Sequence, residues 1–358
     1  MFVVVMAGGS GTRFWPSSRK GRPKQFLNIL GEKPMVVETC DRLVSLARDE
    51  EIVLVMGLEH LEEATALFGT RKIHMLAEPT GRNTAPCIGL GAIYADHLGY
   101  RGPIVFLPAD HFIQDADALV ADIKRAGEIA KAGGIVTLGI VPTRPETGYG
   151  YIRRSKKPVE SSEKPVYRVS AFVEKPDLKT AVAYLTSGEY FWNAGIFVAT
   201  AETITNQIEQ HLPKLYQGLA RLRQTMGTDL FMEDLESVYK QIETISFDYG
   251  IMERTKAPIY VLPSECGWSD VGSWTSLYEL RNKDHDKNRN LSDAGSVLVD
   301  CEGSFVSSQS KRLVACLGLK NCLIVDTPDA LLVADLDRSQ DIREIVARLR
   351  DSKKEDLL

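Results

Sequence analysis

Two cations and several glycines lie close together near the start of the chain. Residues 8–26 read GGSGTRFWPSSRKGRPKQF, and the positions of chemical interest are Gly8, Gly9, Gly11, Thr12, Arg13 and Lys24. Glycines let backbone N–H groups approach phosphate oxygens, and two cations on one loop suit a ligand with several phosphates. The alternative is a surface turn with solvated charges, which we consider weaker because Arg13 and Lys24 share this segment with two prolines.

The segment matches neither of two common phosphate-binding signatures. A dinucleotide fingerprint needs G-x-G-x-x-G at the start of a helix, and Trp15 followed by Pro16 blocks such a helix. A P-loop needs G-K-[ST], which this segment lacks. The sequence therefore predicts a different cationic loop, directly after the apolar run at residues 2–7.

Asp110 is the first candidate metal ligand. It follows the apolar run 104–108, so its carboxylate is expected at the carboxyl end of a strand, where open α/β sheets bind ligands. Mg²⁺ prefers oxygen ligands and needs only one or two carboxylates when substrate phosphates also bind it. An isolated aspartate after a strand more often caps a helix or turn, so the residues alone leave both interpretations open. We interpret the neighbouring His111 as structural.

Composition limits the classes of partner. The 358 residues are 44% hydrophobic and 25% charged, with a formal net charge of -5, which argues against nucleic acid and anionic membranes as partners. No apolar run reaches about 18 residues, and the run at 2–7 has no basic residue before it, so we expect neither a membrane anchor nor a signal peptide. Six scattered cysteines without a C-x-x-C pair predict reduced thiols and a cytoplasmic location.

The elements that must position these side chains follow an alternating pattern. Expected strands are 2–7, 52–57, 73–77, 104–108 and 135–140, and expected helices are 35–46, 61–68, 85–97 and 116–132. Apolar strands that alternate with helices predict an α/β fold with a doubly wound, mostly parallel sheet. Residues 149–201 are less regular, with strands at 167–173 and 195–199 and a helix at 178–185, and they are interpreted as an insertion that caps the sheet.

The remaining sequence predicts helices and then a small β-rich tail. Helices are expected at 201–223 and 232–242 and a strand at 259–262; the tail has expected strands at 296–299, 305–307, 313–317, 322–325 and 331–334 and a helix at 342–349. The polar stretch 281–290 suits a linker. We therefore predict a catalytic domain at 1–285 and a small β-rich C-terminal domain with a terminal helix at 291–358.

Taken together, these segments resemble the mannose-1-phosphate guanylyltransferases of the sugar-phosphate nucleotidyltransferase family. The matching motifs are GGSGTRFWP at 8–16, RPKQF at 22–26, EPTGRNTAP at 78–86, LPADH at 107–111, TGYGYI at 147–152, VEKP at 173–176, WNAGIF at 192–197 and WSDVGSW at 268–274. Ala194 departs from the pattern, because many relatives have serine there. The resemblance implies a Rossmann-like nucleotidyltransferase fold and a partial left-handed β-helix in the tail.

The resemblance also implies roles for individual residues. The resemblance assigns catalysis to Arg13, Lys24, Asp110 and Asp270, and it implies that the two aspartates bind Mg²⁺. It assigns nucleotide binding to Gly8, Gly9, Gly11, Thr12, Arg13, Lys24, Glu78, Asn83 and Thr84. It assigns binding of the sugar phosphate to Gly148, Glu174, Lys175 and Asn193, together with the two aspartates. From the residues alone, Asn83 or Thr84 could equally cap the helix at 85–97, and Glu174 with Lys175 could be a solvated pair.

The implied reaction is transfer of GMP from GTP to mannose 1-phosphate, which gives GDP-mannose and pyrophosphate. A phosphate monoester has a second pKa of about 6, so the attacking oxygen is anionic near neutral pH and no general base is needed. The alternatives are a nucleotidyltransferase for another pair, such as glucose 1-phosphate with UTP or dTTP, and a non-catalytic nucleotide-sugar sensor. A fused phosphomannose isomerase is disfavoured because only a short tail follows the linker. A homodimer through the tail is also implied.

Overall fold

The computed structural model describes residues 1–9, 11–160, 164–293 and 295–358. Ser10, which belongs to the predicted phosphate loop, lies outside the described residues. The chain divides into two compact units, each of which draws on several stretches of sequence. The first unit comprises Met1–Gly8, Thr39–Ala109 and Ile113–Trp268, and the second comprises Gly9–Glu38, Asp110–Phe112 and Ser269–Leu358.

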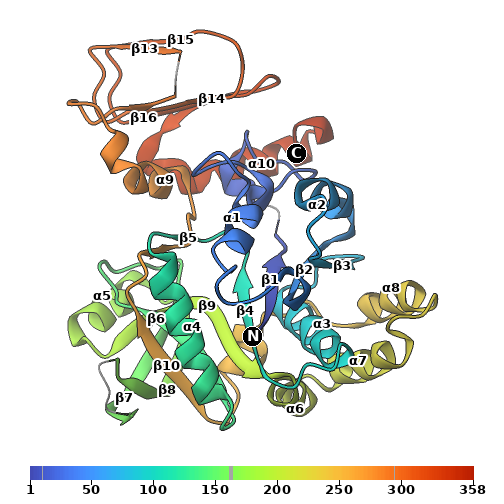
Figure 1. Ribbon diagram of the computed structural model, residues 1–358. Helices are drawn as coiled ribbons and strands as arrows, with labels where there is room; N and C mark the ends of the chain where they lie inside the picture. Colours follow the sequence, from blue (N-terminus) through green and yellow to red (C-terminus); the bar gives the residue numbers. More distant parts are fainter. Residues whose placement is uncertain (10, 161–163, 294) are drawn as a thin grey trace. The chain divides into compact units, whose positions relative to one another are not determined.

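The first unit is built on a nine-stranded sheet. Its strands are β1 (Phe2–Ala7), β2 (Ile52–Gly57), β3 (His74–Glu78), β4 (Pro103–Pro108), β6 (Ile135–Ile140), β7 (Gly150–Glu160), β8 (Val166–Glu174), β9 (Tyr190–Thr200) and β10 (Ile259–Ser264). They follow the order β3-β2-β1-β4-β9-β6-β10-β8-β7 (Figure 1). β1 is parallel to both β2 and β4, with Val3 opposite Ile52 and Val105, and β2 is parallel to β3. All six residues of β1 are buried, as a strand covered on both faces requires.

The prediction of a mostly parallel sheet holds only for part of it. β6 and β10 are parallel, but β9 is antiparallel to β4 and β6, β10 is antiparallel to β8, and β7 pairs antiparallel with β8 and β9. For these strands the prediction is wrong. A parallel pair needs a crossover of about a dozen residues, and the connection from β7 to β8 is too short to supply one. The sheet is therefore mixed.

The first unit also contains helices. They are α2 (Leu61–Phe68), α3 (Thr84–His97), α4 (Ala116–Ala130), α5 (Leu178–Ser187), α6 (Ala201–His211), α7 (Pro213–Thr225) and α8 (Phe231–Gln241), and α1 (Met35–Asp41) precedes them in the chain. α3 contacts β1, and α4 contacts β6 and β9. The helical stretch expected through 201–223 consists of α6 and α7, which are separate because Pro213 has no N–H to continue α6 and instead starts α7. A π-helical turn at Asp248–Met252 was not predicted from the sequence.

The second unit contains the β-rich tail. Its strands are β12 (Leu291–Ser292), β13 (Ser296–Val299), β14 (Phe305–Ser308), β15 (Val314–Leu317), β16 (Cys322–Asp326) and β17 (Leu331–Asp335), with α9 (Trp274–Leu280) before them and α10 (Ile342–Asp351) after them. β5 (Phe112–Ile113) and β11 (Trp268–Ser269) have two residues each. Parallel pairing places Ser296 opposite Val314 and Phe305 opposite Leu323, 18 residues further along the chain in each case. The tail is thus a β-helix-like stack, as expected.

The core of the second unit includes the early loop. Phe14 and Trp15 are buried in one cluster with Trp274, Leu277 and Phe305. The Trp274 ring lies 5.1 Å from the Phe14 ring and 5.7 Å from the Phe305 ring. This apolar contact explains why the segment from Gly9 belongs to the same compact unit as the tail.

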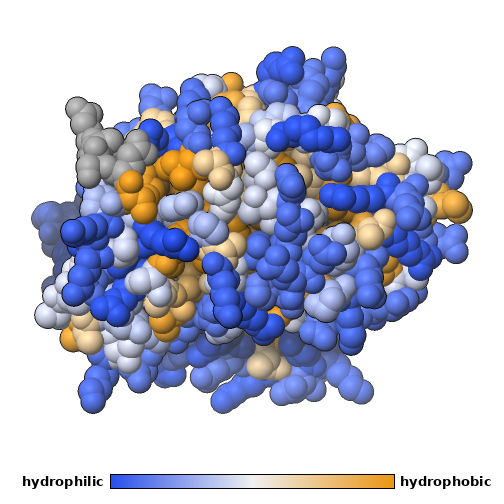
Figure 2. Space-filling view, turned by 90° about the horizontal axis from the view of Figure 1, so that it is seen from below, coloured by the Kyte–Doolittle hydropathy of each residue, from blue (hydrophilic) through white to orange (hydrophobic). Residues whose placement is uncertain are grey.

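The structure bears on membrane association, on the hydropathy of the surface and on the state of the cysteines. Among the described residues, no helix has both the length and the apolar character needed to cross a membrane. The face of the molecule in Figure 2 is mostly hydrophilic, and its apolar residues form small, separate patches. All six cysteines carry free thiols, as expected from their spacing.

Candidate active site

The loop after β1 folds back on itself at Gly11. This residue has φ +58, and a Cβ built on it would lie 2.6 Å from the backbone N of Lys24. Only glycine fits such a close approach in the left-handed region. Ser18 Oγ reinforces the turn by donating to Gly11 O at 2.6 Å. The two limbs of the loop, with short 3-10 turns at Thr12–Phe14 and Lys24–Phe26, are therefore held together.

Lys24 joins the two predicted metal ligands. Its side chain is buried, and Nζ donates to Asp110 O at 2.8 Å, to Asp110 Oδ2 at 3.0 Å and to Asp270 O at 2.6 Å. An ammonium group has three N–H donors, so these acceptors satisfy all of them. Residues that lie up to 246 positions apart in sequence thus meet within the second unit.

These side chains surround one cavity of about 370 Å³. Its lining includes Gly9, Gly11, Thr12, Arg13, Lys24, Asp110 and Asp270, seven of the residues predicted from the sequence. His111, interpreted from the sequence as structural, lines the same cavity. Gly8 is exposed and belongs to the first unit, and nothing lies within 4 Å of a Cβ built on it.

The charges in this cavity favour an ionised Asp110. Burial by itself would raise the pKa of this carboxyl, but the positive charges of Lys24 and His111 outweigh burial and hold the pKa below its usual value. Arg13 is exposed, and its Nη1 donates to Gln340 Oε1 over 3.4 Å. The cavity therefore combines two cationic side chains with aspartates at its wall.

Gly272 lies against two of the predicted residues. A Cβ there would come within 2.7 Å of Asp270 Oδ2 and 3.3 Å of Arg13 Nη1. Any larger residue would push these two side chains out of place. Gly272 lies in the WSDVGSW motif but was not predicted as a site residue.

Asp110 and Asp270 fit a divalent cation chemically. Both are hard oxygen donors on one cavity, which suits Mg²⁺. In the described part of the chain, no three His, Cys, Asp or Glu side chains are grouped as a metal site. A cation there would take its remaining ligands from substrate phosphates and water, as Mg²⁺ commonly does.

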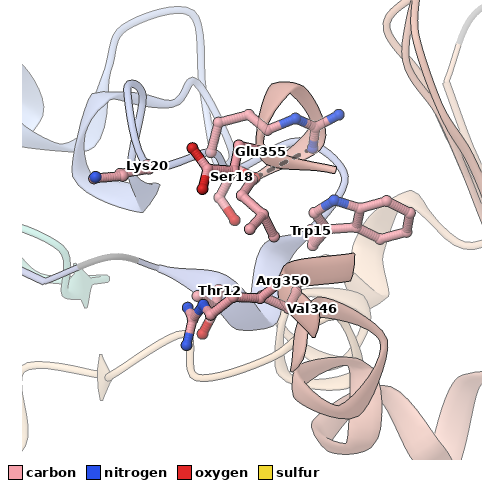
Figure 3. A pocket seen from close by; sticks show the side chains of 9 residues that line it. Thr12, Trp15, Ser18, Lys20, Val346, Arg350 and Glu355 are labelled. Carbon is pink, nitrogen blue, oxygen red and sulfur yellow. Dashed lines mark hydrogen bonds between the residues drawn. The ribbon is translucent and has the colours of Figure 1, made fainter. Parts of the chain in front are cut away.

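A second cavity, of about 490 Å³, is also lined by residues of the loop after β1. Figure 3 shows Thr12 and Trp15 of the loop together with Val346 and Arg350 of α10 among the residues that line it. Trp15 Nε1 donates to Leu357 O at 2.8 Å, which ties the loop to the segment that follows α10. This cavity contains none of Arg13, Lys24, Asp110 and Asp270, so the smaller cavity is the better candidate for a triphosphate.

The residues predicted to bind the nucleotide base lie in the first unit, at the start of α3. Asn83 caps this helix, since its Oδ1 accepts from Thr84 N at 2.8 Å. Thr84 Oγ1 accepts from Phe247 N, also at 2.8 Å. The capping interpretation of Asn83 is confirmed, and its exposed position leaves a role in base binding as a prediction.

Glu78 is buried at the end of β3. Its Oε1 accepts from Tyr239 Oη at 2.9 Å, and the residue is 5% exposed. Burial raises the pKa of Glu78 from 4.5 to about 7, despite the opposing effect of the Tyr239 hydrogen bond. This carboxyl therefore carries a proton over much of the acidic pH range.

E78Q is expected to gain stability relative to the wild type as the pH rises. The unfolded chain releases the Glu78 proton near pH 4.5 and the folded chain near pH 7. Between these values the folded state binds more protons, so the wild-type free energy of unfolding falls with rising pH, by about 3 kcal/mol in total. Urea unfolding of both proteins from about pH 4 to pH 8 measures the difference. Parallel stability curves would contradict the prediction, and E62Q on the exposed face of α2 serves as the control.

The residues predicted to bind the sugar phosphate gather elsewhere in the first unit. The side chain of Glu174, at the end of β8, is 12% exposed, and Lys175 Nζ donates to its Oε1 at 2.7 Å. Glu174 and Lys175 thus form an ion pair in which the lysine side chain is exposed and the glutamate is largely covered, and their role in sugar binding stays a prediction. A Cβ on Gly150 would lie 2.5 Å from Glu174 Oε2 and 3.4 Å from Asn193 Cβ, so Glu174 and Asn193 crowd the same glycine. Gly148 lies in the exposed loop before β7.

Asp248 belongs to this group, although the sequence analysis missed it. Its Oδ1 accepts from Asn193 Nδ2 at 2.8 Å. The segment around Asp248 shows no regular periodicity and resembles none of the quoted motifs. Only its position in the folded chain connects it with the sugar-phosphate residues.

Family models match most of the chain. Residues 2–287 match the nucleotidyl transferase family, and residues 295–349 match the MannoseP isomerase/GMP-like beta-helix domain. The second match agrees with the parallel strands seen in the tail.

Individual proteins are similar over nearly the whole of this chain. The mannose-1-phosphate guanylyltransferase RfbM of Salmonella typhimurium is 39% identical over 97% of this chain and 72% of its own length. The mannose-1-phosphate guanylyltransferase of Escherichia coli K12 is 38% identical over 98% of this chain and 73% of its own. A crystal structure from Thermus thermophilus, described as a mannose-1-phosphate geranyltransferase, has a TM-score of 0.87 and 34% identity, over 98% of this chain and 99% of that one.

Proposed function

Because this chain belongs to the nucleotidyl transferase family, we propose that it transfers GMP from GTP to mannose 1-phosphate, forming GDP-mannose and pyrophosphate. The geometry of Lys24 carries the proposal, because one buried ammonium group contacts Asp110 and Asp270 beside a cavity that also contains Arg13. The relatives named mannose-1-phosphate guanylyltransferase support GTP and mannose 1-phosphate as the substrates.

The chain's residues would act through charge and alignment. An anionic oxygen of mannose 1-phosphate attacks the α-phosphorus of GTP, and the bond to pyrophosphate breaks. Arg13 and Lys24 bind the triphosphate, and Lys24 shifts from Asp110 toward the α-phosphate as charge develops there. Backbone N–H groups of Gly9, Gly11 and Thr12 can meet phosphate oxygens. Mg²⁺ held by Asp110 and Asp270 would neutralise phosphate charge.

Two groups in the first unit would select the substrates. Glu78, Asn83 and Thr84 are assigned to the guanine nucleotide, with Asn83 and Thr84 at the N-terminus of α3. Gly148, Glu174, Lys175 and Asn193 are assigned to mannose 1-phosphate, with the Lys175 cation for its phosphate. The low exposure of the Glu174 side chain supports this assignment, because a partly buried carboxylate beside an amide can bind sugar hydroxyls.

The finer features of the fold belong to the same proposal. We place the catalytic domain at 1–285 and the small domain at 291–358, with the parallel strands of the latter wound as a left-handed coil. The 18-residue spacing of the β13–β15 and β14–β16 pairs supports a coil. A cytoplasmic location is also proposed.

A homodimer through the tail is supported by exposed apolar side chains. Val299 and Leu317 pair across β13 and β15 and are 46% and 72% exposed. Exposed apolar side chains side by side favour association. The double variant V299K/L317K is expected to halve the mass measured by light scattering. A wild-type protein of monomer mass would contradict the dimer.

The test of function is a substrate matrix. Purified protein with Mg²⁺ is offered GTP, ATP, UTP or dTTP with mannose, glucose or other sugar 1-phosphates, and pyrophosphate release is measured. GTP with mannose 1-phosphate is expected to give the highest kcat/KM. A higher value for glucose 1-phosphate with UTP or dTTP would support the alternative enzyme, and no release with any pair would support a sensor.

A further inference from the structure

Asp248 begins the π-helical turn Asp248–Met252 and points its carboxylate at another element. Its Oδ1 accepts from Nδ2 of Asn193 on β9, a residue 55 positions away in sequence. The carboxylate also bonds to the Asp248 backbone, but the hydrogen bond from Asn193 joins two segments that are distant in sequence. π-helical turns occur frequently at functional sites.

The hydrogen bonds around Asn193 fix the orientation of its amide. Asn193 Oδ1 accepts from Gly195 N at 3.1 Å and from Thr137 Oγ1 at 3.3 Å. With both acceptor positions engaged, the Nδ2 group must face Asp248. Asp248 accepts from one of the two amide N–H groups, and within residues 1–9, 11–160, 164–293 and 295–358 no second acceptor contacts Nδ2, so the other N–H is available to a ligand.

Glu174 lies close to this pair. It shares the space above Gly150 with Asn193, and its charge acts on Asp248. Burial, followed by the Glu174 charge, raises the pKa of Asp248 to about 6, while Lys175 opposes the rise. Holding two carboxylates together in a partly buried site costs stability, and such costs are concentrated at functional sites.

Resting on the proposed function, we infer that Asp248 is a positioning residue of the sugar site. It fixes the Asn193 amide so that the remaining N–H, together with the Glu174 carboxylate, meets hydroxyl groups of the sugar 1-phosphate. Without Asp248 the amide can rotate and exchange its N–H and C=O groups. The site then loses an oriented donor and discriminates less well between epimeric sugars.

The test compares D248A with the conservative variant D248N. D248A is expected to raise KM for mannose 1-phosphate about 10- to 100-fold, with KM for GTP within about twofold of the wild type. Its preference for mannose 1-phosphate over glucose 1-phosphate should fall. D248N retains an oxygen acceptor for Asn193 and should recover most of the loss. D122N serves as the matched control, because Asp122 is a buried carboxylate in the same unit that accepts from Ser264 and Lys164.

The outcomes separate this inference from the proposed function. If the wild type is active and D248A has an unchanged KM for mannose 1-phosphate, the inference alone is overturned. Equal increases in the KM values for mannose 1-phosphate and GTP would also overturn it. An inactive wild type would overturn the proposed function. Calorimetric titration of mannose 1-phosphate into the wild type and D248A then decides about Asp248: weaker binding in D248A supports the positioning role, and equal or absent binding in both overturns it.

Discussion

Replacing Asp270 by asparagine is expected to lower kcat about 10²- to 10³-fold while the protein keeps its fold. Asparagine has nearly the same shape but no charge, so it is a poor ligand for Mg²⁺. The contact between Asp270 and Lys24 uses the backbone carbonyl of Asp270, at 2.6 Å, which D270N leaves unchanged. The variant therefore isolates the carboxylate of Asp270.

The D270N substitution should lower turnover but leave thermal unfolding nearly unchanged. We expect a melting temperature near that of the wild type, lower kcat, and a higher Mg²⁺ concentration for half-maximal activity. D329N is the control, because Asp329 lies in the same unit but pairs with Arg19 at the surface. Wild-type turnover in D270N, with an unchanged Mg²⁺ dependence, would remove Asp270 from the metal site.

Replacing Lys24 by methionine is expected to lower both activity and stability. Methionine fills a similar volume but donates no hydrogen bond, so Asp110 Oδ2 and two backbone carbonyls lose their donor. Breaking a fully buried ion pair costs about 3–5 kcal/mol, but the Asp110 side chain is 32% exposed, so we expect about 2 kcal/mol. Loss of the triphosphate cation should lower kcat about 10³-fold.

A double-variant cycle tests whether Lys24 and Asp110 are coupled. K24M/D110N should be less destabilised than the sum of the single variants, because the single K24M variant leaves a carboxylate without its cation. Urea unfolding of the four proteins gives the coupling free energy. Additive effects on stability would contradict the paired arrangement, and an active K24M would contradict the catalytic role.

The sequence predicts the residues of the second unit's cavity well. Arg13, Lys24, Asp110 and Asp270 lie on segments with distinct motifs, and the structure gathers them on one cavity. Their common location depends on Lys24, whose contacts span 86 and 246 residues. No local pattern contains such distances, so the resemblance rather than periodicity indicated the grouping.

Other features could not be predicted for physical reasons. Strand periodicity identifies β9 but not its direction, because both parallel and antiparallel central strands are buried. Asp248 acquires its partners only through tertiary contacts with β9. Gly272 is needed because Asp270 and Arg13 lie against it, which a single sequence does not reveal.

The fate of an ¹⁸O label tests most directly whether the protein transfers GMP to mannose 1-phosphate. Mannose 1-phosphate with ¹⁸O in its non-bridging phosphate positions is incubated with GTP, Mg²⁺ and the protein, and the products are identified by mass and ³¹P spectroscopy. Attack of the sugar phosphate on the α-phosphorus predicts GDP-mannose that carries all of the label, one ¹⁸O being in the bridge between its phosphates, together with unlabelled pyrophosphate. Label in the released pyrophosphate, or GDP and phosphate in place of GDP-mannose, would contradict guanylyl transfer.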